Sequence, residues 1–341
     1  MTERCSGNRI SHRIERTNLN ISPGGASQAG RRMDRTDIAL CLFLMSNSRT
    51  PYHELAARLG LSINAVHKRI GAMANLGIIR AFTAHPSLQF LGTVTVWIHG
   101  RSEAARPGDL RLRLKADDRT YWVANSGGGY AYVGGYLRDI YELDEFVGFV
   151  KREGEMSNPA VCILPSAGKP SRESLRPLDY QILASMRRDS RKPATDIAAE
   201  VNASAKTVHR RLEWMVEKGL VDFTIDWYPD ASNDIVAVCH VEVAKGFDRM
   251  KALENLRDRF AQKILVEMLF SNLPNQIALF MWTNSMKEME DLRESLSGTQ
   301  GVDSVILNVL QIGYIFETWR DALVLEKAGL SEPKTRDMSK S

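Results

Sequence analysis

The chain has 341 residues, of which 44% are hydrophobic and 25% charged, and this composition excludes a wholly disordered or fibrous protein. At roughly 100–200 residues per domain, a chain of this length holds about two to four domains. Its longest apolar run covers only residues 38–45, far short of the ~20 residues that span a bilayer. The first 30 residues lack the apolar segment of a secretory signal. We therefore predict a cytoplasmic protein without a membrane partner.

The net charge of +4 is concentrated at the N-terminus. Residues 1–32 contain six arginines, with Glu3 and Glu15 as their acidic residues, so the rest of the chain is neutral overall. A surface for nucleic acid must therefore be a local basic patch. We expect residues 1–32 to be a flexible basic extension, either an arm that follows DNA phosphates or a stretch upstream of a native start at Met33.

Residue types that could support catalysis or bind a metal form no recognisable pattern in the sequence. The four cysteines are far apart without a C-x-x-C pair, which predicts neither a zinc site nor a disulfide framework, and we expect Cys41 and Cys239 to be reduced and packed in cores. No Ser/His/Asp set, paired carboxylates, Gly-x-Gly-x-x-Gly or metal-ligand cluster appears. The sequence thus predicts a protein that is not an enzyme and has no cofactor.

A repeat organises the chain. Shifting the sequence by 142 positions places residues 37–79 on residues 179–221 without a gap, with 12 of 43 pairs identical. The identical pairs include Ser48/Ser190, Arg49/Arg191, Pro51/Pro193, His67/His209 and Arg69/Arg211. We interpret the protein as one two-part unit used twice.

Each copy begins with the pattern of three short helices. In the first copy Ile38, Leu42 and Met45 predict an amphipathic first helix, and residues 51–59 form a second helix that Gly60 ends. Ser62 then caps a third helix, whose inward face is Val66, Ile70 and Met73. In the second copy Ser204 is the cap, and the inward face is Val208, Leu212 and Met215. This order predicts a helix-turn-helix in each copy, and the strands expected at 78–83 and 220–225 suggest a wing.

The second part of each copy alternates strand and helix. The expected strands are 93–99, 121–126, 130–136 and 160–164 in the first copy, with helices at 109–116 and 140–153. In the second copy the strands are 235–243, 264–270, 276–283 and 302–312, with helices at 249–261 and 286–296. The order βαββαβ is that of a ferredoxin-like domain, an antiparallel sheet with helices on one face.

The stretch "LAARLGLSINAVHKRIGAMANLGII", placed before a βαββαβ domain, resembles the Lrp/AsnC (feast/famine) family of prokaryotic transcription regulators. The resemblance covers residues 33–165 and again 175–315. Members usually carry one such unit and dimerise through the second domain, so this chain is expected to form a pseudo-dimer within itself, with a homodimer of chains as the alternative. The fold class is thus α+β, a tandem duplication of a winged helix-turn-helix and a ferredoxin-like domain. The expected divisions are a basic extension at 1–32, helix-turn-helices at 33–87 and 177–230, ferredoxin-like domains at 88–165 and 231–327, a linker at 166–176 and a flexible tail at 328–341.

The third helix of each helix-turn-helix, called here the recognition helix, is expected to enter the major groove of double-stranded DNA. Asn64 is suited to an adenine edge, and Lys206 or Arg210 to guanine. For each of these residues the alternative is a solvated helix face, and for Arg69 and Arg211 it is a structural salt bridge. Arg49 and Arg191 are predicted to contact phosphate. The full set of predicted DNA contacts is Arg49, Ser62, Asn64, His67, Lys68, Arg69, Arg191, Ser204, Lys206, Thr207, His209, Arg210 and Arg211.

The resemblance also implies a small-molecule effector near the turn between the second and third strands. Gly127, Gly128, Gly129 and Tyr130 occupy this turn in the first copy. Ala131 stands where family members carry an acid, which argues against an amino-acid ligand. The alternative is that the glycines simply make a tight hairpin.

Two other functions stay open beside a sequence-specific DNA-binding transcription regulator. The siroheme decarboxylases pair two units of this fold, but residues 121–136 and 264–283, where their histidines and arginines act, contain neither residue type here. His99 and His240 on the first strands are expected to be packed or at the surface. The third alternative is an interaction module that no longer binds DNA.

Overall fold

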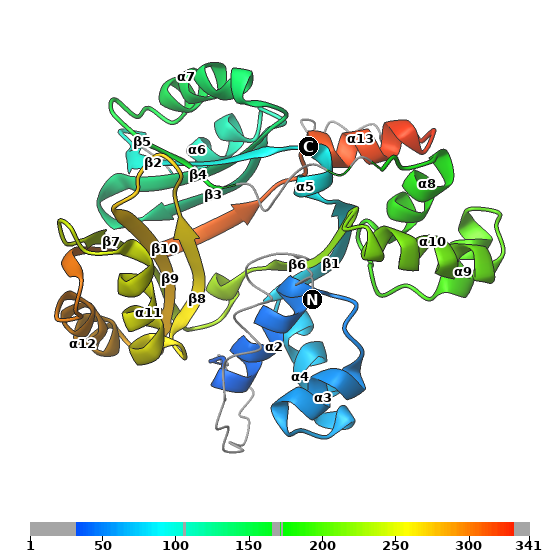
Figure 1. Cartoon of the computed structure of the whole chain (residues 1–341), viewed down its shortest axis with the longest axis horizontal. Helices are drawn as coiled ribbons and strands as arrows, with labels where there is room; N and C mark the ends of the chain where they lie inside the picture. The colour runs from blue at the N-terminus through cyan, green and yellow to red at the C-terminus, as the bar shows by residue number, and fades with distance from the viewer. Residues whose placement is uncertain (1–31, 105–106, 166–170, 172, 331–341) are drawn as a thin grey trace, which may run out of the picture.

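The computed structural model describes residues 32–104, 107–165, 171 and 173–330. Nearly all of the predicted N-terminal extension, most of the predicted linker and most of the tail lie outside these residues. Figure 1 shows two helical units, at the bottom and the right, and two units built on sheets, at the left and the top. Within the described residues, every helix is too short or too polar to cross a membrane.

The two helical units are the predicted helix-turn-helices. The first contains α2 (Arg35–Ser46), α3 (Tyr52–Leu59) and α4 (Ile63–Asn75), and the second contains α8 (Pro177–Met186), α9 (Ala194–Glu200) and α10 (Ala205–Glu217). Both predicted caps are confirmed, because Ser62 Oγ accepts a hydrogen bond from Ala65 N and Ser204 Oγ accepts one from Thr207 N, each at 3.1 Å. Gly60, in the left-handed conformation at φ +64°, ends α3 as expected.

The inward faces of both recognition helices, α4 and α10, are also as predicted. Val66, Ile70 and Met73 of α4, and Val208, Leu212 and Met215 of α10, are all buried. These residues recur every three to four positions, so they line one face of the helix and pack on the two preceding helices. The opposite face of each recognition helix is therefore left to solvent.

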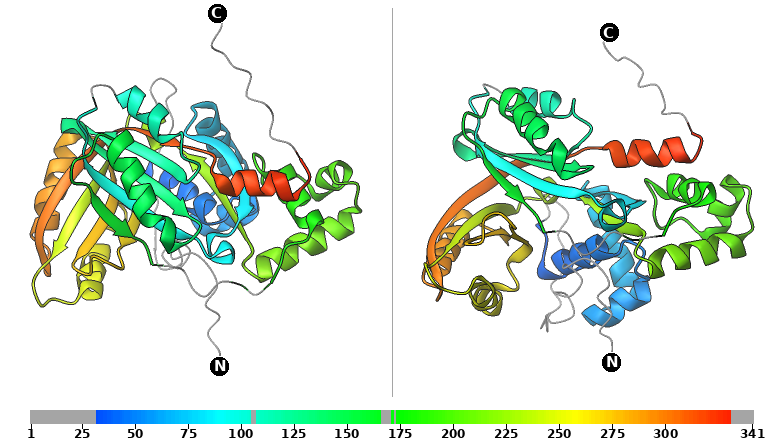
Figure 2. Two further views of the ribbon diagram at one scale, coloured as in Figure 1. Left: turned by 90° about the horizontal axis from the view of Figure 1, so that it is seen from above. Right: turned by 45° about the horizontal axis from the view of Figure 1, so that its top comes forward.

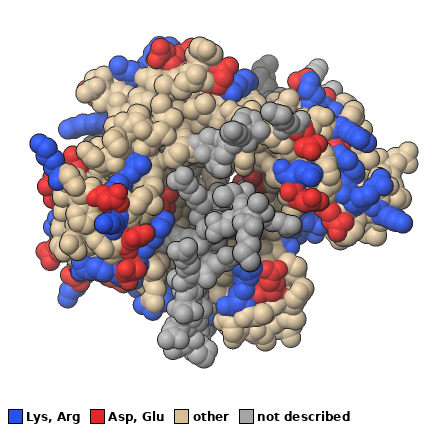
Figure 3. Space-filling model, viewed as in Figure 1, with Lys and Arg blue, Asp and Glu red and all other residues tan. Residues whose placement is uncertain are grey.

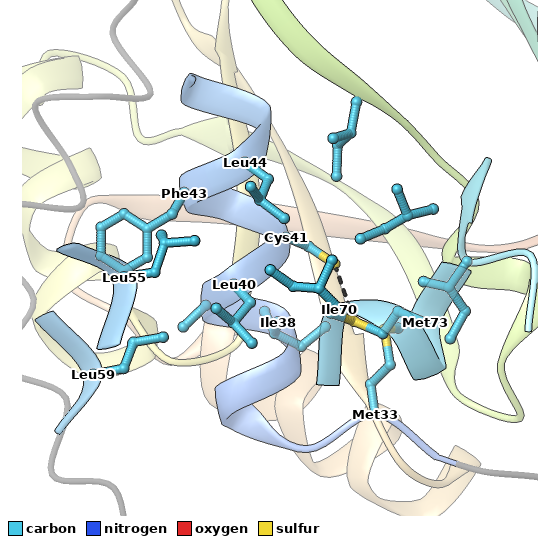
Figure 4. Close-up of a cluster of buried hydrophobic side chains, with 14 of the residues drawn as sticks. Met33, Ile38, Leu40, Cys41, Phe43, Leu44, Leu55, Leu59, Ile70 and Met73 are labelled. Atoms are coloured by element: carbon cyan, nitrogen blue, oxygen red, sulfur yellow. Dashed lines mark hydrogen bonds between the residues drawn. The ribbon is translucent and has the colours of Figure 1, made fainter. Parts of the chain in front are cut away.

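The first helix, α2, is buried more widely than its sequence stripe predicted. Leu40, Cys41 and Leu44 are completely buried, whereas Leu42 and Met45 of the predicted stripe are only partly so. Figure 4 shows this core, in which the Cys41 thiol lies 3.5 Å from the Met73 sulfur. Val236, Leu265 and Trp282 of the second sheet unit belong to the same cluster. Because α2 packs against its own helices and against a sheet, it needs apolar residues on more than one face.

The predicted wings do not form separately in each copy. Strands β1 (Ile79–Pro86) and β6 (Val221–Trp227) instead pair with each other, antiparallel, with Thr83 opposite Thr224. Within the described residues, neither strand has a second strand of its own copy beside it, so each satisfies its backbone groups with the equivalent strand of the other copy. The two helix-turn-helices are therefore joined by a two-stranded ribbon in the centre of Figure 1.

The two sheet units have the predicted βαββαβ order. The first consists of β2 (Val94–Arg101), α6 (Pro107–Leu114), β3 (Thr120–Ser126), β4 (Tyr130–Leu137), α7 (Leu143–Glu153) and β5 (Ala160–Ile163). The second consists of β7 (Ile235–Val243), α11 (Arg249–Phe260), β8 (Ile264–Leu269), β9 (Gln276–Thr283), α12 (Met286–Ser297) and β10 (Val302–Ile315). Short helices or turns connect these elements: α5 (Leu88–Leu91), η1 (Gly127–Gly129), η2 (Ile140–Glu142) and η3 (Pro229–Ala231).

The eight strands form one continuous sheet in the order β5-β2-β4-β3-β10-β7-β9-β8. Strands β3 and β10 join the two halves, and Figure 2 shows β10, in orange to red, running from the second half past the first. At the outer edges the sheet nearly closes on itself. Asn272 accepts a hydrogen bond from Ile163 N at 2.9 Å and donates one to Val161 O at 2.8 Å, and thereby holds β5 beside the end of β8.

The inner faces of the two halves pack against each other. Their shared core consists of Trp97, Tyr132, Cys162, Val238, Phe270 and Ala278, each with at most 1% of its surface exposed. The two copies of the repeat thus share one sheet and one core. Burial of Cys41 and Cys239 in cores is confirmed as well.

A last helix, α13 (Trp319–Lys327), was not among the predicted elements. It follows β10 and contributes Val324 to the core of the second helix-turn-helix. At its start the Trp319 indole N–H donates to Tyr136 O at 2.8 Å, and Trp319 N donates to Asp118 O at 2.9 Å. The second helix-turn-helix is therefore held beside the first sheet unit, whereas the first packs on the second.

Candidate nucleic-acid interface

The recognition helix of the first copy presents polar side chains at its N-terminal end. Ser62, Asn64, His67 and Lys68 are exposed, and no other described domain covers them. The His67 ring contacts the ring of Tyr52 edge-on, with centroids 5.5 Å apart. This end of α4 offers an amide, an imidazole and an ammonium group to an approaching molecule.

The N-terminal end of the second recognition helix exposes more cationic side chains than that of the first. Lys206, His209 and Arg210 are exposed and Thr207 is half-buried. His209 Nε2 lies 3.2 Å from a carboxylate oxygen of Glu213, one turn further along the helix. Figure 3 shows Lys and Arg side chains, interspersed with Asp and Glu, on the second helix-turn-helix at the right, whereas the visible part of the first, at the bottom, is mostly uncharged.

Arg69 and Arg211, matched in the two recognition helices, form salt bridges inside their own domains. One Arg69 nitrogen donates to Asp34 and to Asp37, both at 2.8 Å. Burial opposes the charge of Arg69, but these two hydrogen bonds outweigh it and raise the pKa of the guanidinium. Arg211 donates to both oxygens of Asp179, at 2.6 and 2.5 Å, and Asp179 is fully buried. Both arginines therefore form structural salt bridges, the alternative to a contact with DNA.

Arg49 and Arg191 also point into the protein. Each guanidinium donates to backbone carbonyls of the other copy, and both side chains are half-buried. Burial, and for Arg49 also the neighbouring charge of Arg191, lowers the pKa of both groups. These contacts leave neither arginine directed toward the exposed face of a recognition helix.

The glycines predicted to contact an effector form a tight turn. Gly128 and Gly129 have φ values of +69° and +73°, a conformation that favours glycine over residues with a side chain. A Cβ atom on Gly129 would also lie 3.0 Å from the carbonyl oxygen of Ser102. Tyr130 turns inward, and its hydroxyl is 2.8 Å from His99 Nδ1. The backbone conformation of the turn is therefore enough to explain why Gly128 and Gly129 are glycines.

The sequence analysis did not identify several residues that contact the predicted DNA-binding side chains. Asp34, Asp37 and Asp179 hold the recognition-helix arginines, and Tyr52 supports His67. The signal was present for the acids, since Asp37 and Asp179 are identical in the repeat, as are their arginine partners. In the part of the chain that the structure describes, no three His, Cys, Asp or Glu residues are grouped as metal ligands.

A capped helix with an exposed polar face, present twice on helix-turn-helix units, defines the class of helix-turn-helix DNA-binding proteins. Comparison with known families agrees with this class. Residues 33–74 match the family model of the AsnC-type helix-turn-helix domain, and residues 175–222 match that of a winged DNA-binding helix-turn-helix.

Relatives identify the family. An uncharacterized HTH-type transcriptional regulator of Pyrococcus horikoshii is 42% identical over 143 residues, which are 41% of this chain and 97% of the relative. Another from Pyrococcus furiosus is 44% identical over 94 residues, 28% of this chain and 55% of the relative, so the match spans about half of that protein. The chain belongs to the Lrp/AsnC family of helix-turn-helix transcription regulators.

A solved structure shares the fold over most of the chain. The siroheme decarboxylase NirDL superposes with a TM-score of 0.55 over 87% of this chain and 99% of its own, at 13% sequence identity. At this identity the similarity concerns the fold alone. It shows that the tandem arrangement of helical and sheet units also occurs in another protein.

Proposed function

We propose that this protein is a sequence-specific regulator of transcription that binds double-stranded DNA with both recognition helices. The observation that carries the proposal is the exposed polar face at the N-terminal ends of α4 and α10, together with the family. A helix in the major groove reads base edges with these positions, while flanking groups hold phosphates. Because prokaryotic chromosomes lie in the cytoplasm, we place its action there.

In the first copy, Asn64 is suited to hydrogen bond both N6 and N7 of an adenine. His67 and Lys68 follow on the exposed face of α4, and Ser62 lies at the helix start, where a hydroxyl can donate to a phosphate. In the second copy, Lys206 and Arg210 are suited to guanine acceptors, and Thr207, Ser204 and His209 flank them. The two half-sites are therefore expected to differ in sequence.

Four residues of the sequence-based set have other contacts in the structure. Arg69 and Arg211 bind buried carboxylates, and Arg49 and Arg191 bind carbonyl groups of the opposite copy. We leave these four arginines out of the proposed DNA contacts. The remaining nine residues, Ser62, Asn64, His67, Lys68, Ser204, Lys206, Thr207, His209 and Arg210, form the proposed contact set.

We propose that the ferredoxin-like units serve assembly. The sheet shared by the two copies supports a pseudo-dimer within one chain, with the divisions at 33–87, 88–165, 177–230 and 231–327 as its domains. A dimer of two chains would carry four recognition helices. A small-molecule effector remains part of the proposal, although the turn at Gly127–Gly129 carries no acidic group for an amino acid.

The salt dependence of DNA binding tests the main proposal. Affinity for duplex DNA should fall linearly with salt on a log–log plot, because each neutralised phosphate contributes a slope of about −0.9. A selected site should also be bound more tightly than random duplex, by roughly 10³-fold or more at physiological salt. A flat salt slope without preference for any sequence would favour the interaction module.

The second candidate is an enzyme of the decarboxylase type, which the shared fold with NirDL favours. Against it, the space between the two sheet halves is filled by Trp97, Tyr132 and Phe270, all at most 1% exposed. We therefore propose that the chain is not an enzyme. A purified protein with Soret-region absorbance would contradict this and favour the second candidate.

A further inference from the structure

The loops that precede α3 and α9 meet at the centre of the two helix-turn-helices. Ser48 and Ser190, equivalent in the repeat, are both fully buried and share a hydrogen bond of 2.6 Å between their hydroxyls. Their backbone amides bind the central ribbon crosswise, Ser48 N to Phe223 O at 3.2 Å and Ser190 N to Phe82 O at 2.8 Å. Each loop is thus attached to the strand of the other copy.

Two arginines reinforce this contact from both sides. Arg191 donates to Ser48 O at 2.6 Å and to Thr50 O at 3.0 Å. In return, Arg49 donates to Ser190 O and, more weakly, to Lys192 O at 3.4 Å. Each guanidinium also lies over an aromatic ring of the ribbon, Arg49 at 5.6 Å from Phe223 and Arg191 at 5.5 Å from Phe82. We call Ser48, Arg49, Ser190 and Arg191 the arginine clasp.

We propose that the arginine clasp fixes the distance between the two recognition helices and thereby sets the half-site spacing that the protein accepts. This inference rests on the proposed DNA binding and makes Arg49 and Arg191 positioning residues. Pro51 at the end of the first loop is the N-cap residue of helix α3, which packs on α4. Pro193 at the end of the second loop is the N-cap residue of helix α9, which packs on α10. Fixing the two loops together therefore fixes both recognition helices.

The clasp is asymmetric at one point. The Arg191 guanidinium lies 4.3 Å from the centre of the Tyr52 ring, and the same ring contacts His67 on the recognition helix of the first copy. The position equivalent to Tyr52 in the second copy is Ala194, whose methyl group offers no such contact to Arg49. Within the described residues, this side-chain connection to a base-reading position therefore belongs to Arg191 and not to Arg49.

The test is selection of duplexes from a random library by the full-length protein and by Arg49→Lys/Arg191→Lys. Lysine keeps the charge but lacks the planar fork that spans two carbonyl groups. We expect the native protein to select two half-sites at one spacing, and the double variant to select the same half-sites at several neighbouring spacings. Arg191→Lys alone should also relax base preference in the half-site of the first copy, whereas Arg49→Lys should not. Arg58→Lys, an exposed arginine on α3 paired with Glu54, is the control and should behave as the native protein.

A second measurement needs no DNA. Spin labels at Asn75→Cys and Glu217→Cys, equivalent exposed positions at the ends of the two recognition helices, report their separation in a chain that also carries Cys5→Ser. One narrow distance distribution is expected for the native clasp, and a broader one for the double variant. An unchanged narrow distribution in the double variant would overturn the inference.

The outcomes separate this inference from the proposed function. If the native protein selects no duplex, the proposed function fails, and the spin-label distances still decide the clasp. If Arg49→Met/Arg191→Met keeps the single spacing but its salt slope is smaller by about two units, both arginines are phosphate contacts and the clasp inference is wrong.

Discussion

His99 and His240 face each other between the two sheet halves, with ring centroids 4.6 Å apart. Each lies on the first strand of its βαββαβ unit, and each hydrogen bonds a tyrosine of the first copy: His99 to Tyr130 at 2.8 Å and His240 to Tyr132 at 2.9 Å. Two like-charged imidazolium rings at this distance would repel each other in a poorly hydrated core. The shared core of the two copies therefore depends on both histidines staying neutral.

This pair predicts a loss of stability in acid. Burial, together with the neighbouring His240, lowers the pKa of His99 to about 3, and burial lowers that of His240 to about 4. In the unfolded chain both groups titrate near 6.5, so the unfolded state binds more protons between pH 6.5 and about 3, and stability falls as the pH drops. The combined loss should be on the order of 8 kcal/mol, because each unit of pKa difference is worth about 1.4 kcal/mol, and urea unfolding at several pH values measures it.

The matched variants for this pH effect are His99→Gln/His240→Gln and His53→Gln. Removing the buried pair should flatten the decline between pH 6.5 and 4, even if the variant is less stable at neutral pH. His53 is exposed on α3, so its replacement is the control for removing a histidine outside the shared core. Equal slopes in all three proteins would show that the histidine pair is not responsible.

Arg211 is expected to be important for folding. Asp179 is 0% exposed and Arg211 satisfies both of its oxygens, so Arg211→Met leaves an uncompensated buried charge. The cost should be about 3–5 kcal/mol in urea or thermal unfolding. The double variant Asp179→Leu/Arg211→Met should recover much of this loss, because it removes both charges. Arg58→Met, which breaks an exposed pair with Glu54, should change stability little.

The two recognition helices should contribute unequally to DNA binding. Lys206→Ala/Arg210→Ala removes two exposed cations, so it should weaken binding and reduce the salt slope by about 0.9 for each phosphate that is no longer neutralised. Asn64→Ala removes no charge, so it should relax sequence preference at one half-site and leave the slope unchanged. Lys218→Ala removes one exposed cation just after the far end of α10 and is the control; it should lower the affinity much less. If the double variant binds with native affinity and slope, α10 is only structural.

Helix α13 is expected to hold the second helix-turn-helix and not the first. Trp319 is 8% exposed and donates hydrogen bonds to two backbone carbonyl groups of the first sheet unit. Trp319→Ala should cost about 3–5 kcal/mol. Hydrogen exchange should then increase in α8 and α10, while α3 and α4 keep native protection. Equal deprotection of both helix-turn-helices would contradict a local role of α13.

The sequence by itself determined the elements and their duplication, because these depend on local patterns. Ser62 and Ser204 act within four residues of chain, Gly60 ends a helix through its own backbone freedom, and the strand order follows from alternating patterns read in sequence. The family resemblance followed from the same patterns. The inward faces of α4 and α10 could also be predicted from local sequence, because the helical spacing of apolar residues identifies the buried face whatever it packs against.

The tertiary structure alone decided which surfaces the two copies share. Nothing local in residues 79–86 or 221–227 indicates that these strands pair with each other, and nothing before α3 or α9 shows that Arg49 and Arg191 reach across to the opposite copy. The contact between His99 and His240 and the packing of α13 on the second helix-turn-helix could not be predicted from the sequence either. The physical reason is that these contacts join groups more than 100 positions apart, and their partners are fixed only when the sheet halves and the ribbon have brought the two copies together.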